Sequence, residues 1–190
     1  MTLPLLLLAL LWPSGPAPDY AALYARGVPF TEFLATATAK QDEWRTRYRD
    51  ALVRPELVEK AKALPGHYRL LVVAEDWCSD SAQSIPYLAK LVDAAPDTLE
   101  MRVINSKTGR AVMDAHPTPD GRGATPTVAV LTADGVLIGA WSERPAELEA
   151  WSIAQRKVLS QRDLHDQMAK WYATDAGTSA LTEILALLTR

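Results

Sequence analysis

The residues with the clearest capacity for chemistry form the segment Trp-Cys-Ser-Asp-Ser at positions 77–81. Cys78 is the only cysteine among the 190 residues, so any thiol chemistry depends on one sulfur atom. The apolar run 70–74 before it predicts a buried strand, and the run 82–91 after it predicts a helix. A cysteine at this junction would lie among the free N–H groups at the start of a helix, where the helix dipole favours an anion. The sequence therefore predicts a nucleophilic cysteine.

Four side chains beside the cysteine bear on its reactivity. Asp76 and Asp80 would oppose formation of a thiolate through like-charge repulsion. Asp80 has two interpretations: it transfers protons during exchange, or it is an ordinary acid of the first turn of a helix, where an acid is favoured anyway. The hydroxyl of Ser81, one turn after the thiol, is expected to donate to the sulfur and offset part of that repulsion. Trp77 has two interpretations: it is a platform for a peptide substrate, or an aromatic side chain that only packs.

The composition excludes several other kinds of chemistry. One cysteine rules out an intramolecular disulfide, and His67, His116 and His165 lie too far apart to show the spacing of metal ligands. We therefore expect no metal site. The formal net charge of −3 argues against nucleic-acid binding, and the basic run 45–49 is typical of the solvated face of a helix.

The N-terminal segment leaves the location of the protein open. Leu3 to Trp12 has the length of a signal-peptide apolar region and is too short to span a bilayer. No Lys or Arg precedes this run, and residues 13–18 contain no clean cleavage site. Export, a retained apolar arm and a start codon assigned too far upstream all remain possible. We expect a cytoplasmic protein without a transmembrane span, with export or membrane association as the alternative.

Apolar periodicity and turn residues predict an alternation of helices and strands along the rest of the chain. The expected elements are a helix or a stacked pair of helices over 29–52, a helix over 55–63, a strand over 68–74, a helix over 82–93 kinked at Pro86, a strand over 99–104, a short helix within 105–116, two strands over 127–132 and 136–141, helical structure over 146–172 and a helix over 179–188. This order predicts an α/β layer architecture whose strands run in mixed directions.

The pattern resembles the thioredoxin superfamily between Leu70 and about Ala150. Trp77-Cys78 follows the strand expected over 68–74, as in the active site of that family, and Pro86 lies where thioredoxins carry a helix-kinking proline. The run 124–128, Ala-Thr-Pro-Thr-Val, looks like the cis-proline loop of the family, and Asp134-Gly135 falls at the position of its hairpin. Four landmarks in the same order make the resemblance specific.

The resemblance implies an α/β fold with a thioredoxin-like mixed β-sheet flanked by helices and with N-terminal and C-terminal helical extensions. The expected divisions are an apolar arm or signal-like segment over 1–18, a helical extension over 19–66, a thioredoxin-like domain over 67–172 and a C-terminal helix over 173–190. The extension and the context of residues 75–78 look closest to a bacterial thioredoxin-like branch. In such proteins the residue before the cis-proline exposes backbone groups to a bound peptide, which implies that Trp77, Thr125 and Pro126 contact substrate.

Two departures from the thioredoxin pattern narrow the expected chemistry. Ser81 stands where thioredoxins carry the resolving cysteine, and Val72 stands where they bury an acid. Cys78, with Ser81 beside it, is then expected to perform monothiol exchange, forming a mixed disulfide with glutathione or a protein thiol. This needs no resident cofactor, and glutathione would be a co-substrate. A redox-inactive protein-binding module is the alternative, and iron–sulfur ligation with an external thiol is a weaker third.

Overall fold

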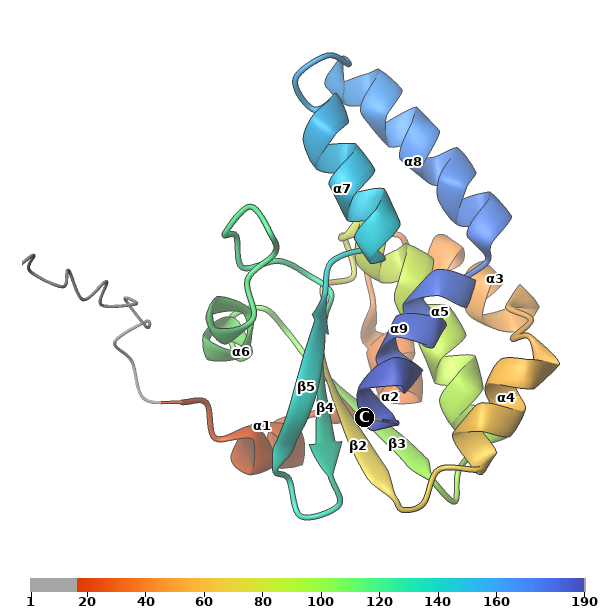
Figure 1. Ribbon diagram of the computed structural model, residues 1–190, viewed down its shortest axis with the longest axis vertical. Helices are drawn as coiled ribbons and strands as arrows, with labels where there is room; N and C mark the ends of the chain where they lie inside the picture. The colour runs from red at the N-terminus through yellow and green to blue at the C-terminus, as the bar shows by residue number, and fades with distance from the viewer. Residues whose placement is uncertain (1–16, 190) are drawn as a thin grey trace, which may run out of the picture.

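A five-stranded mixed sheet forms the centre of the computed structural model, which describes residues 17–189 (Figure 1). The strands lie in the order β1-β3-β2-β4-β5. Their bounds are β1 Val28–Pro29, β2 Tyr68–Val73, β3 Leu99–Ile104, β4 Thr127–Thr132 and β5 Leu137–Ser142. Strands β2 and β3 run parallel, and the other neighbouring pairs are antiparallel. The fold is the thioredoxin-like α/β architecture that the sequence predicts.

Helices cover both faces of this sheet, and one helical pair projects beyond it (Figure 1). The helices are α1 Tyr20–Arg26, α2 Phe30–Thr36, α3 Gln41–Asp50, α4 Pro55–Lys62, α5 Ser79–Ala94, α6 Arg110–Ala115, α7 Ala146–Gln155, α8 Gln161–Asp175 and α9 Thr178–Leu188. Helices α5 and α9 pack on one face, while α1 and α6 pack on the other. Within residues 17–189, no helix is both long enough and apolar enough to cross a membrane.

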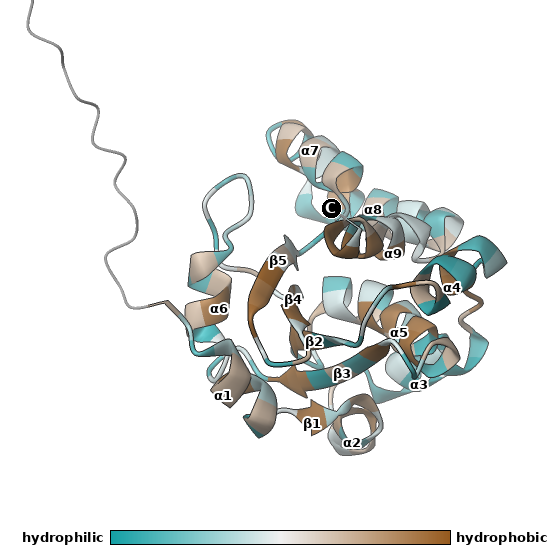
Figure 2. Cartoon of the chain, turned by 60° about the horizontal axis from the view of Figure 1, so that its bottom comes forward, coloured by the Kyte–Doolittle hydropathy of each residue, from teal (hydrophilic) through white to brown (hydrophobic). Residues whose placement is uncertain are grey.

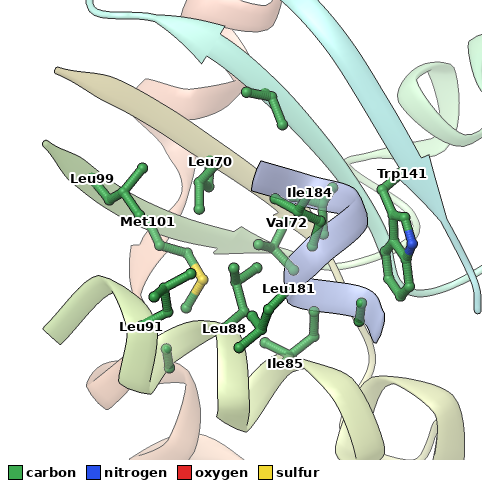
Figure 3. Packing of buried hydrophobic residues seen from close by; sticks show 14 of the residues in the cluster. Leu70, Val72, Ile85, Leu88, Leu91, Leu99, Met101, Trp141, Leu181 and Ile184 are labelled. Carbon is green, nitrogen blue, oxygen red and sulfur yellow. The ribbon is translucent and has the colours of Figure 1, made fainter. Parts of the chain in front are cut away.

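The alternation of side chains along β2 explains why both faces of the sheet are buried. Leu70 and Val72 point toward Ile85 of α5 and Ile184 of α9, in the larger core (Figure 3). Leu71 and Val73 point to the opposite face and pack against α1 and α6. Because successive residues of a strand face opposite sides, a strand covered on both sides is apolar throughout. Figure 2 shows these apolar strands enclosed between the helical layers.

Helix α5 begins earlier than its apolar pattern indicates. The pattern predicts a start at Ala82, whereas the helix begins at Ser79, because Cys78 has an extended backbone and caps the first turn. Pro86 lies inside α5 and is buried. The thiol therefore belongs to the helix N-cap rather than to a loop before the helix.

The region 29–52 forms two helices, α2 and α3, which is one of the two arrangements expected there, and Lys40 adopts the left-handed conformation just before α3. Two other features of the fold differ from the sequence-based expectations. The region 146–172 also divides, since Ser160 caps a new helix by accepting a hydrogen bond from the N–H of Asp163. Strand β1 lies within the segment 19–66, where the sequence predicts only helices. Its Val28 pairs with Val103 of β3 at the edge of the sheet. Most of the apolar arm predicted over 1–18 lies outside the described residues.

Candidate functional site

Cys78 lies where the chain leaves β2 and enters α5, at the carboxyl end of the central strand. Its Sγ accepts a hydrogen bond from the N–H of Ser81 at 3.5 Å, as a capping side chain does. The residue is 8% exposed, so the thiol side chain is largely buried. A hydrogen bond from a helix N–H favours the charged form of a capping group.

The loop that contains Thr125 and Pro126 lies directly against the thiol. The Thr125–Pro126 peptide bond is cis, and the thiol of Cys78 donates to the carbonyl oxygen of Thr125 at 3.2 Å. The Thr127 hydroxyl donates to the carbonyl oxygen of Ala124 at 2.7 Å and so fixes the start of β4. Three of the residues selected from the sequence, Cys78, Thr125 and Pro126, therefore meet at one end of the sheet.

Ser81 is near the sulfur but contacts it differently from the sequence-based expectation. The expected donor was the hydroxyl, whereas the donor in the structure is the main-chain N–H. The Oγ atom of Ser81 is buried, and among residues 17–189 it has no hydrogen-bond partner. Ser81 thus stands at the position of the resolving cysteine of thioredoxins, and its hydroxyl makes no polar contact within residues 17–189.

Asp76 turns away from the thiol and binds the N-terminal part of the chain. Its Oδ2 accepts hydrogen bonds from the N–H of Thr38 at 2.8 Å and of Ala39 at 2.9 Å. The indole N–H of Trp44 donates to its main-chain oxygen at 2.8 Å. Burial would raise the pKa of the Asp76 carboxyl, but the hydrogen bonds from Ala39 and Thr38 outweigh it and lower the pKa below its usual value. The carboxylate of Asp76 therefore stays ionised and is bound by the amides of the N-terminal segment.

Asp80 is also engaged, on the opposite side of the thiol-bearing turn. The guanidinium of Arg144 donates to both of its oxygens, from Nε at 3.1 Å and from Nη2 at 2.8 Å. The hydroxyl of Tyr172 donates to Oδ1 at 2.8 Å. Burial, followed by the charge of Asp80, raises the pKa of Tyr172 well above its ordinary value, so the phenol stays protonated. The charge of Asp80 is thus compensated by Arg144. The sequence alone suggests an unpaired carboxylate that repels the thiolate.

Arg144 and Tyr172 are site residues that the sequence analysis missed. They lie 64 and 92 positions after Asp80, in the β5–α7 corner and in α8. No local pattern marks either of them. Arg144 belongs to a larger network of charged side chains between α7 and the 118–122 loop, and its other members are Asp120, Arg122, Glu143, Glu149 and Arg156.

Trp77 and Lys40 form the outer surface beside the thiol. Trp77 is 61% exposed, although the residues on both sides of it are held in place. Lys40, at the start of α3, donates from Nζ to the hydroxyl oxygen of Ser79 at 2.6 Å. The N-terminal segment therefore contacts the thiol-bearing loop through Lys40 as well as through the amides of Thr38 and Ala39.

The cavity at this end of the sheet does not include the sulfur. A cavity of about 420 Å³ opens at the carboxyl ends of β2 and β3, and Glu75, Asp76 and Asn105 line one part of it. Its lining extends to α2 and does not include Cys78. Within residues 17–189 no three His, Cys, Asp or Glu side chains are grouped so that they could hold a metal ion. His116 instead contacts the hydroxyl of Tyr20 at 2.7 Å, and burial lowers the pKa of its imidazole.

Comparison with known proteins agrees with this geometry. The sequence profile of a family described as thioredoxin matches residues 27–160, which is most of the chain. The chain belongs to the thioredoxin family. The match begins at β1 and therefore includes much of the segment that the sequence pattern set apart as an extension. A search of curated proteins finds no match.

Two solved structures share the fold of this thioredoxin-family protein. One is a protein of unknown function from Pseudomonas aeruginosa, 22% identical, with a TM-score of 0.71 and coverage of 90% of this chain and 98% of that chain. The other is an HIV epitope scaffold, 24% identical, with a TM-score of 0.69 and the same two coverages. At these identities the similarity supports the fold, and the chemistry of the thioredoxin-family protein has to be argued from its own residues.

Proposed function

We propose that this thioredoxin-family protein carries out monothiol exchange through Cys78, forming a mixed disulfide with glutathione or with a protein thiol. The observation that carries the proposal is the position of the sulfur. Sγ is the N-cap of α5 and lies 3.2 Å from the carbonyl oxygen of Thr125, in the loop whose backbone would pair with an extended peptide. A single thiol placed in this way has a donor that stabilises its anion and a neighbouring backbone that can orient a substrate.

The exchange uses one protein sulfur and one external thiol. The Cys78 thiolate attacks one sulfur of a substrate disulfide, the substrate S–S bond breaks, and the departing thiolate takes a proton from water. The product is a mixed disulfide between Cys78 and half of the substrate. Because position 81 is a serine, a second external thiolate must attack this bond to restore Cys78. A reducing cytoplasm with abundant glutathione would supply that thiolate, which fits the proposed location.

Intact-mass spectrometry after exposure to oxidised glutathione tests the proposal. The wild-type chain is expected to gain one glutathionyl group at Cys78, and reduced glutathione is expected to remove it. Cys78→Ser should gain nothing, whereas Ser81→Ala should react like the wild type because the Ser81 hydroxyl makes no polar contact among the described residues. A wild-type chain that stays unmodified while a small-molecule thiol in the same tube reacts would contradict the proposal.

A second function, protein binding without redox chemistry, is favoured by one specific contrast. The sulfur belongs to a residue that is 8% exposed, whereas the adjacent Trp77 is 61% exposed and offers a large apolar surface to a partner. Under this alternative, complexes recovered with the wild-type chain would also be recovered with Cys78→Ser and would be lost with Trp77→Ala. Under monothiol exchange, the covalent complexes would disappear with Cys78→Ser and on treatment with a reductant.

A further inference from the structure

We propose that Arg144 is a positioning residue for the Cys78 thiol: it compensates the charge of Asp80 in the first turn of α5 and so prevents that carboxylate from suppressing the thiolate. The inference rests on the proposed thiol chemistry and adds to it a residue outside the Trp77–Ser81 segment. The sequence alone places an acid two positions after the nucleophile, which by itself disfavours an anionic sulfur.

The contact between Arg144 and Asp80 has the geometry of a strong ion pair. Two parallel N–H groups of the guanidinium meet the two carboxylate oxygens, at 3.1 Å and 2.8 Å. The two side chains are 9% and 13% exposed, so solvent screens the pair only weakly. Tyr172 fills a further acceptor site on Oδ1 at 2.8 Å. Asp80 is therefore held in one orientation, with its charge directed at Arg144.

The backbone around Arg144 connects this ion pair to the loop on which the thiol rests. Glu143 adopts a left-handed conformation with φ of 63°, and its N–H donates to the carbonyl oxygen of Pro126 at 2.7 Å. A non-glycine residue in this conformation is uncommon and is maintained by surrounding contacts. The β5–α7 corner thus contacts the 125–126 loop through the backbone of Glu143 and contacts α5 through the side chain of Arg144.

Arg144 compensates the charge of Asp80 although two other carboxylates also contact its guanidinium. Glu143 and Glu149 lie within 2.7 Å and 2.5 Å of its guanidinium nitrogens. Arg122 also pairs with both of these glutamates, at 2.8 Å and 3.5 Å, and shares the compensation of their charge. Asp80 is bound by no arginine other than Arg144 among residues 17–189. Removal of Arg144 would therefore leave Asp80 as the carboxylate without a cation.

The other charged groups around the thiol do not replace Arg144. Asp76 faces the amides of Thr38 and Ala39, on the far side of the loop. Lys40 lies on the Ser79 hydroxyl and also approaches Glu43 at 3.8 Å. Tyr172 is a neutral donor, since burial and the charge of Asp80 raise the pKa of its phenol. Of these groups, Arg144 is the cation that pairs with the acid in the thiol-bearing turn.

The test is the rate of alkylation of Cys78 by iodoacetamide, measured from pH 5 to pH 10. Iodoacetamide is neutral, so the charges removed from the protein by the substitutions neither attract nor repel the reagent. Arg144→Met should move the midpoint of the rate profile to higher pH by about half to one unit, which is a threefold to tenfold slower reaction below the midpoint. Asp80→Asn combined with Arg144→Met should restore the wild-type profile, because neither charge remains. Arg156→Met removes a guanidinium that contacts Asp120 and Glu149 but not Asp80, and should leave the profile unchanged.

Each outcome decides for or against the proposal. A profile for Arg144→Met that matches the wild type, or one that the double variant fails to restore, would overturn it. If Arg144→Met does not fold, Asp80→Asn alone provides the test, since Arg144 then lacks its acid and the midpoint should move to lower pH. An unchanged profile in that variant would also overturn the proposal. Alkylation does not depend on exchange with glutathione, so failure of the proposed exchange and failure of this inference are distinguishable.

Discussion

The sulfur of Cys78 and the carbonyl oxygen of Thr125 are hydrogen-bonded at 3.2 Å, with the thiol as donor. Only a protonated thiol can form this bond, whereas the N–H of Ser81 on the other side of the sulfur interacts better with a thiolate. Ionisation therefore removes the contact with Thr125 and strengthens the contact with Ser81. A substrate backbone N–H that pairs with the carbonyl of Thr125 would compete with the thiol for the same acceptor, which links substrate binding to release of the nucleophile.

Ser81→Cys is expected to convert the monothiol site into a dithiol site. The Ser81 side chain is fully buried next to Sγ, and its Oγ has no hydrogen-bond partner among residues 17–189, so a thiol there displaces no polar contact. The new sulfur should attack a mixed disulfide at Cys78 and release glutathione, at least about tenfold faster than release from the wild type. A mass-spectrometric time course without added reductant measures this. Ser81→Ala, which adds no sulfur, should keep the adduct; a persistent adduct in Ser81→Cys would mean that the two side chains cannot approach.

The sheet could be predicted from the sequence because β2 and β4 contain apolar runs that are buried on both faces, and β3 alternates buried with half-buried residues. Residues 99–104 and 127–132 form strands with the expected bounds, and β2 ends one residue before the predicted end. Apolar runs of this length between turn residues determine such strands locally. No apolar run predicts β1, because a segment of two residues becomes a strand only by pairing with β3 at the edge of the folded sheet. The start of α8 did have a signal: Ser160 and Asp163 form a capping pattern inside a region that looks continuously helical.

The site was predictable at its centre and not at its periphery. Cys78, Thr125 and Pro126 could be selected because each resembles a landmark of a known family. The partners of the two aspartates could not, because Thr38 lies 38 positions before Asp76, and Arg144 and Tyr172 lie 64 and 92 positions after Asp80. Contacts of this kind are determined by how helices and corners pack, and they supply each of the two carboxylates with hydrogen-bond donors.

Asp76→Ala is expected to destabilise the fold by about 1–2 kcal/mol at pH 7, because the amides of Thr38 and Ala39 lose their acceptor. The pKa of Asp76 is lowered in the folded state, so its contribution is fully present above the unfolded value of 3.8 and is lost as the pH falls toward the folded value. The difference in free energy of unfolding between wild type and variant should therefore shrink below about pH 4. Urea unfolding at pH 7 and pH 3 measures it. Asp97→Ala changes an exposed carboxyl and is the control; a difference that grows at pH 3 would contradict the assignment.

Tyr172→Phe is expected to weaken the attachment of α8 to α5. The lost hydrogen bond to Asp80 should lower the free energy of unfolding by about 1–2 kcal/mol at pH 8. The folded pKa of Tyr172 lies well above 10.0, so the unfolded phenol ionises first and the wild type loses stability as the pH rises past that value. The variant lacks this phenol and should lose less stability between pH 9 and pH 11. Urea unfolding across this range tests the sign, with Tyr68→Phe as the control; equal alkaline losses in wild type and Tyr172→Phe would refute it.

Trp77→Ala separates a substrate platform from a packing residue. Because Trp77 is 61% exposed, the substitution should change the free energy of unfolding by no more than about 0.5 kcal/mol. If Trp77 is a platform for peptides, the reaction of Trp77→Ala with a disulfide-bonded peptide should be slower by about threefold or more. Its reaction with oxidised glutathione should slow much less. Leu52→Ala, at a side chain that is 84% exposed and lies in the α3–α4 connection, controls for general loss of apolar surface. Equal slowing with both substrates would exclude the platform, and a large loss of stability would identify Trp77 as a packing residue.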